Sequence, residues 1–176
     1  ASGTGFINGP IEESTPSNLT LGTSQMGGTV VLAGANTYTG TTTVAFGTAR
    51  FVKKVSLYNN NPASWTATNL IVNAGKTASF GMGGTGEFTE SDIISLSALG
   101  TATGGFLNTA ILGIDTSNAT APITFASTIA NSNAGANVKG FTKTGNGTLI
   151  LSGTNTYTGK TTVTAGTLQF AKTSAF

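Results

Sequence analysis

The 176-residue sequence contains no cysteine and no histidine, and only 8% of its residues are charged. The absence of cysteine excludes a disulfide framework and thiol chemistry. The absence of both residues excludes the usual zinc sites and Ser–His or Cys–His catalytic pairs within this chain. No run of about 20 apolar residues is present, so we expect no helix that spans a membrane.

The scarcity of charge does not indicate disorder. Disordered chains usually combine low hydrophobicity with high net charge, whereas 38% of these residues are hydrophobic and the formal net charge is +2. Threonine is abundant and glycine occurs 25 times, a composition typical of many short strands joined by tight turns. A net charge this small does not indicate nucleic-acid binding. We therefore expect an all-β protein whose copies repel one another only weakly.

The clearest pattern is a 24-residue repeat, found at 28–51 and again at 147–170, in which 15 of the 24 paired positions are identical. Each copy reads as a strand, an Asn-Thr-Tyr-Thr-Gly turn, a short second strand closed by glycine, and a third strand. We expect Asn155 and Gly159 to adopt left-handed backbone conformations in their turn. The predicted structural turn residues are Gly34, Asn36, Tyr38, Gly40 and Gly47, and their counterparts Gly153, Asn155, Tyr157, Gly159 and Gly166.

Short strands with glycine or asparagine corners and no long crossover helices are typical of a β-solenoid. We expect a single solenoid domain over residues 1–176, in which residues 52–146 form a spacer between the repeat copies. Coils of roughly 20–25 residues would give about seven or eight coils. The two identical turns are then expected on equivalent corners, about five coils apart.

One segment departs from the strand pattern. Thr89 is a suitable N-cap, acidic residues follow it, and Gly100 ends the segment, which together predict a short helix near 90–98. The helix would cover the flank or an end of the solenoid, or else dock a partner subunit. The carboxylates of Glu87, Glu90 and Asp92 favour helix capping. Calcium binding is the alternative, although their spacing matches no known calcium loop.

Two further groups of side chains could contact a partner. Arg50, Lys53 and Lys54 form the only basic run and indicate a solvated turn or strand end, or else a contact to an acidic surface or a polysaccharide. Four aromatic residues could stack against sugars, although the two tyrosines within the repeat favour a structural role at the corners. The four are Tyr38, Tyr58, Trp65 and Tyr157.

Residues 138–170 contain GTLILSG, NTYTG and TTVTAGTL, and they closely resemble the passenger-associated transport repeat, also called the autotransporter-associated β-strand repeat. The copy at 28–51 departs from that pattern at Phe46 and Ala49. The resemblance implies a right-handed parallel β-helix in an exported bacterial protein, secreted or held at the cell surface. It implies no catalytic residues and no cofactor, and we expect no enzymatic activity.

The second repeat copy stops within its period, and no polar cap is visible in the sequence at either end. If these are the true termini, the end coils are expected to stack head to tail and build an extracellular filament or surface layer. The alternative is a passenger segment of an autotransporter adhesin that binds glycans or a host surface. The residues expected at the contacts between copies are Phe6, Ile7, Leu168, Phe170 and Phe176.

Overall fold

The computed structural model describes residues 3–22 and 27–171, and every pairing between its named strands is parallel. A seven-stranded sheet, called the long sheet below, takes every second strand of the chain. In spatial order it contains β1 (Thr4–Ile7), β3 (Thr29–Leu32), β5 (Thr48–Phe51), β7 (Thr77–Gly81), β9 (Ile111–Asp115), β11 (Gly140–Thr144) and β13 (Thr161–Val163).

The other strands form two shorter sheets. One contains β2 (Leu19–Leu21), β4 (Thr42–Val44), β6 (Leu70–Val72) and β8 (Gly105–Phe106), and the other contains β10 (Ile123–Phe125), β12 (Thr148–Leu151) and β14 (Thr167–Phe170). The chain therefore alternates between the long sheet and a shorter sheet, which confirms the predicted parallel β-helix. Its right-handedness stays a prediction. Four 3₁₀ turns lie in the connections: η1 (Lys54–Ser56), η2 (Tyr58–Asn60), η3 (Pro62–Ser64) and η4 (Asn133–Gly135).

Alternate residues of the long sheet point into the core and stack on their neighbours. Leu32, Phe51, Phe80 and Ile114 share one register row and are completely buried. The rings of Phe51 and Phe80 are stacked, with centroids 5.7 Å apart. The residues between them in sequence point outward, because successive side chains of a strand face opposite sides. This alternation explains why apolar residues and threonines follow one another in the strands.

The Asn-Thr-Tyr-Thr-Gly turn is held by side chains that point into the solenoid. Asn36 is buried; its Oδ1 accepts a hydrogen bond from the Ile11 backbone N–H at 2.8 Å, and its Nδ2 donates to the Ser56 carbonyl at 2.8 Å. Tyr38 is also buried, and its hydroxyl accepts a hydrogen bond from Thr42 at 2.8 Å. The asparagine thus links the turn to the coils on both sides of it.

The second copy of the turn repeats this arrangement in part. The Oδ1 of Asn155 accepts from the Ile129 backbone N–H at 3.0 Å, and the hydroxyls of Tyr157 and Thr161 are 2.6 Å apart. The expectation that Asn155 and Gly159 are left-handed is wrong, because neither has a positive φ. Glycine is needed at Gly159 for a different reason: a Cβ there would collide with the backbone at Lys139 of the preceding coil.

In each copy, the glycine that closes the short strand does have the left-handed conformation. Gly47 has a φ of 60° and Gly166 a φ of 67°, values that L-residues rarely adopt. The other predicted turn glycines share the close approach seen at Gly159, with a Cβ position blocked by the backbone of the coil before; they are Gly34, Gly40 and Gly153. Glycine is thus needed at these six positions for two distinct steric reasons.

The two repeat copies do not occupy equivalent positions in the solenoid. In the first copy the long strands β3 and β5 belong to the long sheet and the short strand β4 to a shorter one. In the second copy the short strand β13 belongs to the long sheet, and the longer strands β12 and β14 to the three-stranded sheet. The expectation of equivalent corners is therefore wrong, because the copies are half a coil out of phase.

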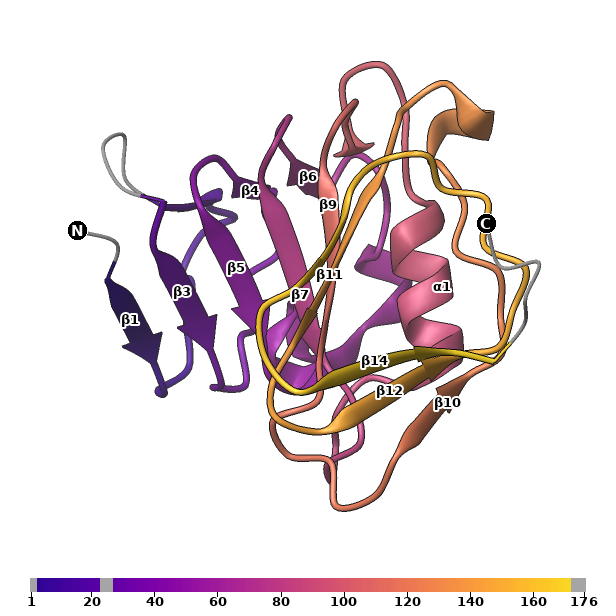
Figure 1. The fold of residues 1–176 in the computed structure, drawn as a ribbon. Helices are drawn as coiled ribbons and strands as arrows, with labels where there is room; N and C mark the ends of the chain where they lie inside the picture. The colour runs from indigo at the N-terminus through magenta and orange to yellow at the C-terminus, as the bar shows by residue number, and fades with distance from the viewer. Residues whose placement is uncertain (1–2, 23–26, 172–176) are drawn as a thin grey trace.

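The predicted helix is present as α1 (Glu90–Ala98), and it lies in the connection between β7 and β8, just before the chain leaves the four-stranded sheet for the three-stranded one. Thr89 and Asp92 form a reciprocal capping box at its start. Ile93 and Leu96 are completely buried in the hydrophobic core. In Figure 1, strands β1, β3, β5 and β7 lie side by side from the left toward the centre, whereas β10, β12 and β14 lie at the lower right with α1 above them. The helix therefore fills the interior where the path of the solenoid changes.

Candidate functional site

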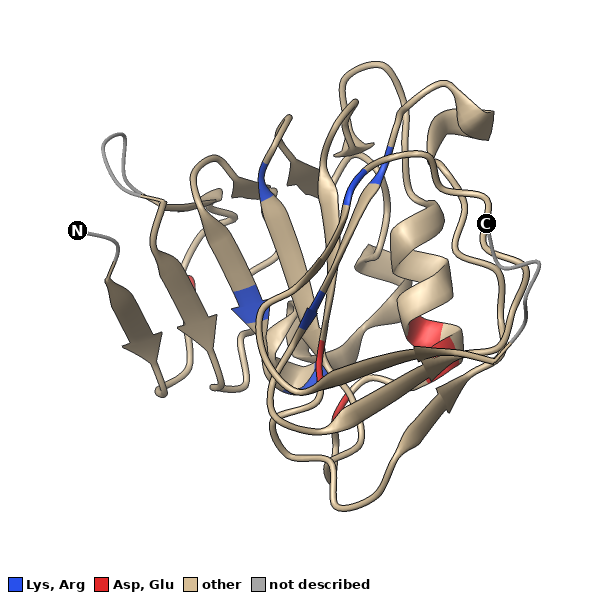
Figure 2. Ribbon diagram, in the orientation of Figure 1, with Lys and Arg blue, Asp and Glu red and all other residues tan. Residues whose placement is uncertain are grey.

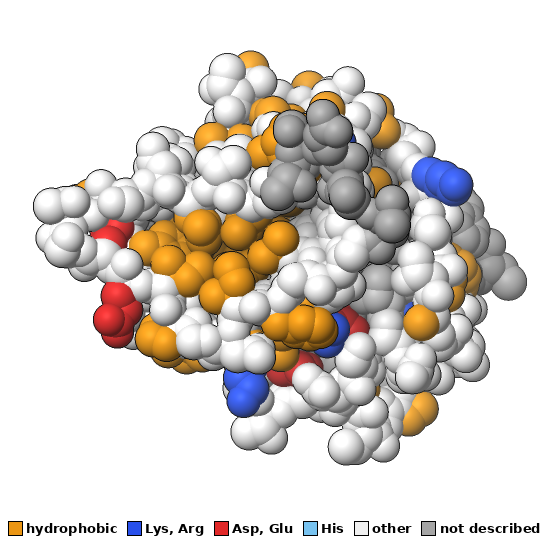
Figure 3. All heavy atoms as spheres, turned by 90° about the vertical axis from the view of Figure 1, so that its left-hand side faces the viewer, with side chains coloured by type: hydrophobic (Ala, Val, Ile, Leu, Met, Phe, Trp, Pro, Cys, Tyr) orange, Lys and Arg blue, Asp and Glu red, His pale blue; other side chains and the backbone are white. Residues whose placement is uncertain are grey.

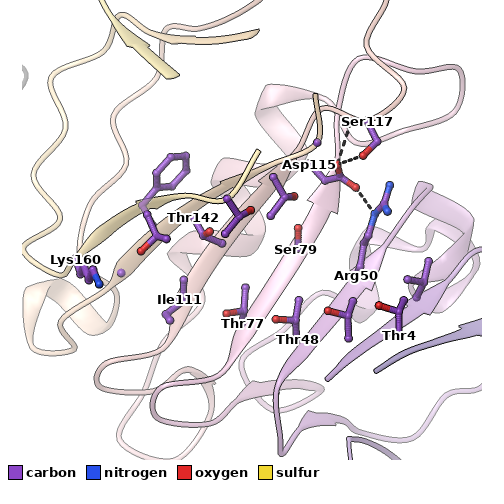
Figure 4. Close-up of a pocket in the computed structure, with 18 of the residues that line it drawn as sticks. Thr4, Thr48, Arg50, Thr77, Ser79, Ile111, Asp115, Ser117, Thr142 and Lys160 are labelled. Carbon is purple, nitrogen blue, oxygen red and sulfur yellow. Dashed lines mark hydrogen bonds and ion pairs between the residues drawn. The ribbon is translucent and has the colours of Figure 1, made fainter. Parts of the chain in front are cut away.

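A groove of about 810 Å³ lies on the outer face of the long sheet. Its floor includes Thr4, Thr29, Thr48 and Thr77, which are partners in successive strand pairs and so form one row across the sheet. Figure 4 shows Thr4, Thr48 and Thr77 of this row, followed by Ile111 and then Lys160 toward the other end of the sheet. The groove thus runs across the strands of the long sheet.

One end of the groove contains a buried ion pair. Arg50 Nε contacts Asp115 Oδ2, and Asp115 is 1% exposed whereas the Arg50 side chain is 25% exposed. The other carboxylate oxygen, Oδ1, accepts hydrogen bonds from the backbone N–H and the hydroxyl of Ser117, at 2.9 and 2.6 Å. Because the two charges cancel, this end of the groove presents hydrogen-bonding groups without a net charge.

Ser79 lies in the groove floor and lacks a hydrogen bond. Its side chain is 1% exposed, and no described residue is a partner for its Oγ. A Cβ at Gly113, its neighbour in β9, would collide with the Ser79 side chain, so the two strands fit together here only with glycine at that position. An unpaired buried hydroxyl costs about 1–3 kcal/mol, so Ser79 is a group that a ligand could satisfy.

The acidic residues of the predicted helix start are held by three different protein segments. Glu87 accepts hydrogen bonds from the Gly84 N–H at 2.7 Å and from the Asn118 side chain at 2.6 Å, and Glu90 accepts from the Ser127 N–H. Asp92 caps the helix and Glu90 lies in its first turn, whereas Glu87 lies outside the helix, so the capping interpretation is wrong for Glu87. Among the described residues, no group of three or more potential ligands could hold a metal ion.

The carboxyl of Asp92 has a lowered pKa. Burial would raise the pKa of its carboxyl, but the hydrogen bonds from Thr89 and the ion pair with Lys54, at 2.9 Å, outweigh that effect and hold the pKa below its ordinary value. The basic run is therefore not simply solvated. Arg50 is paired in the groove and Lys54 is paired with the helix start. Figure 2 shows how few other charges the ribbon carries.

The predicted sugar-stacking aromatics lie in the core instead. Tyr38, Tyr58 and Trp65 are buried members of the hydrophobic cluster, and Trp65 packs near Phe88 with ring centroids 6.0 Å apart. Tyr157 is half-buried against the same cluster. These rings cannot offer an open face to a sugar, so their role is to fill corners of the solenoid.

Two lysines point into the core, which the sequence reading missed. Lys143 is buried, and its Nζ donates to the carbonyls of Gly145 and Ala165. Burial lowers the pKa of Lys143, and the nearby Asp115 carboxylate opposes that change. The sequence does contain a pattern that predicts an inward Lys143, because it follows Phe141 at the inward positions of the alternating segment GFTKT.

The burial of Lys139 is expected to give the protein an unusual dependence of stability on pH. Its Nζ donates to the carbonyls of Ser97 and Ala130 and lies 5.3 Å from the centroid of the Phe106 ring. Burial lowers the pKa of Lys139 from 10.5 to about 8. The unfolded chain therefore binds more protons than the folded chain between pH 8 and pH 10.5, so stability rises with pH in that range. We expect a gain of about 2 kcal/mol between pH 7 and pH 9.5.

Urea unfolding at pH 7, 8, 9 and 9.5 measures this gain, and Lys139→Met should remove most of it. Above pH 10 the trend should reverse. Burial raises the pKa values of Tyr38, Tyr58 and Tyr157 in the folded protein, so the unfolded chain loses these protons first. A flat profile from pH 7 to 9.5 in the unmodified protein would show that Lys139 is not desolvated as described.

Both ends of the solenoid expose core-facing positions. At one end the core-facing Ile7 is half-buried and the neighbouring Phe6, which faces outward, is 66% exposed, and Figure 3 shows apolar side chains gathered on this end of the molecule. At the other end Val163 is 46% exposed, Phe170 is 37% exposed and Leu168 is half-buried. Phe6 itself lies on the outer face, in the groove. Phe176 lies outside the described residues.

The comparison with protein families agrees with the repeat described above. The family model of the passenger-associated-transport-repeat matches residues 27–48 and 141–170, which include the two Asn-Thr-Tyr-Thr-Gly corners. Searches among curated proteins and among solved structures found no match. A repeat of this kind indicates an exported or surface protein. Within the described residues, no helix has the length and apolar character needed to cross a bilayer.

Proposed function

We propose that this chain, which is built on passenger-associated transport repeats, is a structural and non-catalytic β-solenoid segment of an exported bacterial surface protein. Its end coils stack on further coils of the same kind, and in the isolated chain these belong to a second copy. Head-to-tail repetition of that contact would build a filament. The observation that carries the proposal is the partial exposure, among the described residues, of core-facing apolar positions at both ends of one parallel stack.

The strand edges at the two ends support this proposal. β1 and β13 are the outermost strands of the long sheet, and β2 is outermost in the four-stranded sheet. Among the described strands, each of these three therefore pairs along one edge only. Unpaired edges of this kind are templates for another strand. A coil added at either end would continue the hydrogen-bonded ladder and cover the apolar row beneath it.

The inward side chains at the two ends are of compatible type. Leu19 and Leu21 face inward at one end, where Leu21 pairs with the buried Val44. At the other end Val163 pairs with the buried Lys143, and Leu168 pairs with the buried Leu149. Apolar residues thus meet apolar residues when one end is placed on the other. The contact joins two different surfaces, so it does not close and can propagate.

Single substitutions at the two ends test the proposal. In sedimentation velocity and electron microscopy, the unmodified chain should form linear oligomers that lengthen with concentration. Val163→Lys should weaken this association at least about 100-fold, because the contact would bury a charge that has no partner. Gln169→Lys is the matched control. It lies on the same end coil but points outward, since it pairs with the outward-facing Ile150, so it should assemble normally.

Mixing two blocked variants tests whether the contact is head to tail. Leu19→Lys blocks one end and Val163→Lys blocks the other, so each variant alone should be monomeric. Their equimolar mixture should give one-to-one dimers and nothing longer, because each retains one working end. An unmodified chain that remains monomeric at millimolar concentration would refute self-stacking, and a mixture without dimers would refute its head-to-tail geometry.

A further inference from the structure

We propose that the groove on the outer face of the long sheet is a binding site for a neutral polysaccharide chain that lies across the strands. The inference is separate from the stacking of end coils, because the floor between β3 and β9 lies away from both ends. Nothing in the role of a structural segment requires such a groove. Three features of the groove support a bound polysaccharide: the row of threonine hydroxyls, the unpaired Ser79 and the Arg50–Asp115 ion pair.

The hydroxyl row suits a ligand with many hydroxyls. Thr29, Thr48 and Thr77 lie on neighbouring strands, so they repeat about every 4.8 Å along the groove. Each presents a hydroxyl, which can donate and accept, beside a methyl group. A sugar ring likewise presents hydroxyls around an apolar face. Val31 and Ile111 in the same lining provide further apolar surface for such a face.

The polar end of the groove favours a neutral ligand. The Arg50–Asp115 pair uses Nε of the guanidinium, and the terminal amino groups of Arg50 can donate to a ligand oxygen. Because Asp115 cancels the charge of Arg50, an anionic sugar would gain little electrostatic attraction there, and Lys160, the other cation of the lining, lies at the far end of the groove (Figure 4). A neutral sugar hydroxyl could accept from Arg50. Another hydroxyl could provide the hydrogen bond that Ser79 lacks among the described residues.

The main alternative occupant is an extended peptide. A peptide needs partners for its backbone N–H and C=O groups. The backbone groups of β3, β5, β7 and β9 are already used in the ladders on both sides of each strand. The groove therefore offers only side chains, and mainly hydroxyls, to whatever lies in it. A ligand that hydrogen-bonds through its own hydroxyl groups fits that surface better than a peptide does.

The test is an NMR titration that follows the backbone amides of the full 176-residue chain carrying Leu19→Lys, which keeps it monomeric. The probes are cellohexaose, laminarihexaose and maltohexaose, with hexagalacturonic acid as the anionic sugar and a ten-residue threonine-rich peptide as the alternative ligand. We expect at least one neutral hexasaccharide to shift the amides of β5, β7 and β9. The anionic sugar and the peptide should bind more weakly or not at all.

Two isosteric variants locate the site. Thr48→Val and Ser79→Ala should each weaken binding of the neutral sugar about tenfold, since each removes one hydroxyl from the floor. Thr43→Val is the matched control, because Thr43 points outward from a shorter sheet and lines no part of the groove. Ser79→Ala should leave the unfolding midpoint unchanged or higher, because its hydroxyl is unpaired in the free protein. A loss of sugar binding through misfolding is thereby distinguished from a loss of contact.

Three results would overturn the inference. The first is the absence of shifts in β5, β7 and β9 with every neutral hexasaccharide at about 10 mM, a concentration that detects even weak affinity. The second is tighter binding of the anionic sugar or the peptide in the same groove. The third is neutral-sugar binding that neither Thr48→Val nor Ser79→Ala weakens.

Discussion

Replacing Asn36 with alanine is expected to lower the free energy of unfolding by about 4 kcal/mol. The side chain is completely buried and bonds the Ile11 N–H on one side and the Ser56 carbonyl on the other, both at 2.8 Å. Alanine would leave both backbone groups buried without these partners, and each such loss costs about 1–3 kcal/mol. Urea or thermal unfolding followed by circular dichroism measures the change.

Asn155→Ala provides a matched control at the same position of the second copy. Asn155 bonds the Ile129 N–H at 3.0 Å, but its Nδ2 donates only to Gly153 of its own corner, at 3.4 Å. It therefore links its corner to one neighbouring coil, and we expect a loss of about 1–2 kcal/mol. Equal losses in the two variants would show that the bond from Asn36 to Ser56 contributes little.

The comparison of these two corners shows what the sequence encodes locally. The motif itself determines the inward asparagine, the tyrosine–threonine hydrogen bond and the left-handed Gly47 and Gly166. These features depend on residues within the motif and on contact with the coil before it. The same strand–turn–strand unit therefore forms in both copies and could be predicted from 24 residues.

The sequence did not reveal which sheet each copy joins. The strands of both copies alternate inward and outward positions in the same way, so either phase satisfies the pattern. The phase is set in the spacer, where α1 and the two-residue strand β8 replace a regular coil. The helix could be predicted from its capping residues. Its effect on the path of the solenoid depends on how Ile93 and Leu96 pack, which periodicity does not show.

The groove was hidden from the sequence for a related reason. Outward threonines could be predicted from the strand alternation, but Arg50 and Asp115 are 65 positions apart (115 − 50) and belong to strands separated by β7. Their pairing depends on the register of three strands. Ser79 lies between them and was unremarkable in the sequence. The site thus arises from the stacking order of the strands, which the repeat alone does not show.

Replacing Phe80 with alanine is expected to cost about 3–5 kcal/mol, the range for truncating a buried phenylalanine. Phe80 is completely buried on β7, the last strand before α1. Its ring stacks on Phe51 at 5.7 Å and meets Phe88 edge to face at 5.0 Å. It therefore joins the regular coils to the segment where the phase changes, and its loss opens a cavity at that junction. Calorimetry of the variant measures the cost.

Phe6→Ala is the control for Phe80→Ala, because Phe6 is 66% exposed on the outer face and should cost less than about 0.5 kcal/mol. Hydrogen exchange adds a spatial test. Each coil contacts mainly its neighbours, so Phe80→Ala should speed exchange first in β5, β7 and α1. Faster exchange only in β1 and β2 would contradict this assignment. If Phe80 packs the junction as described, amide exchange in the variant will be faster on both sides of it, at Phe51 before the helix and at Ile93 within the helix.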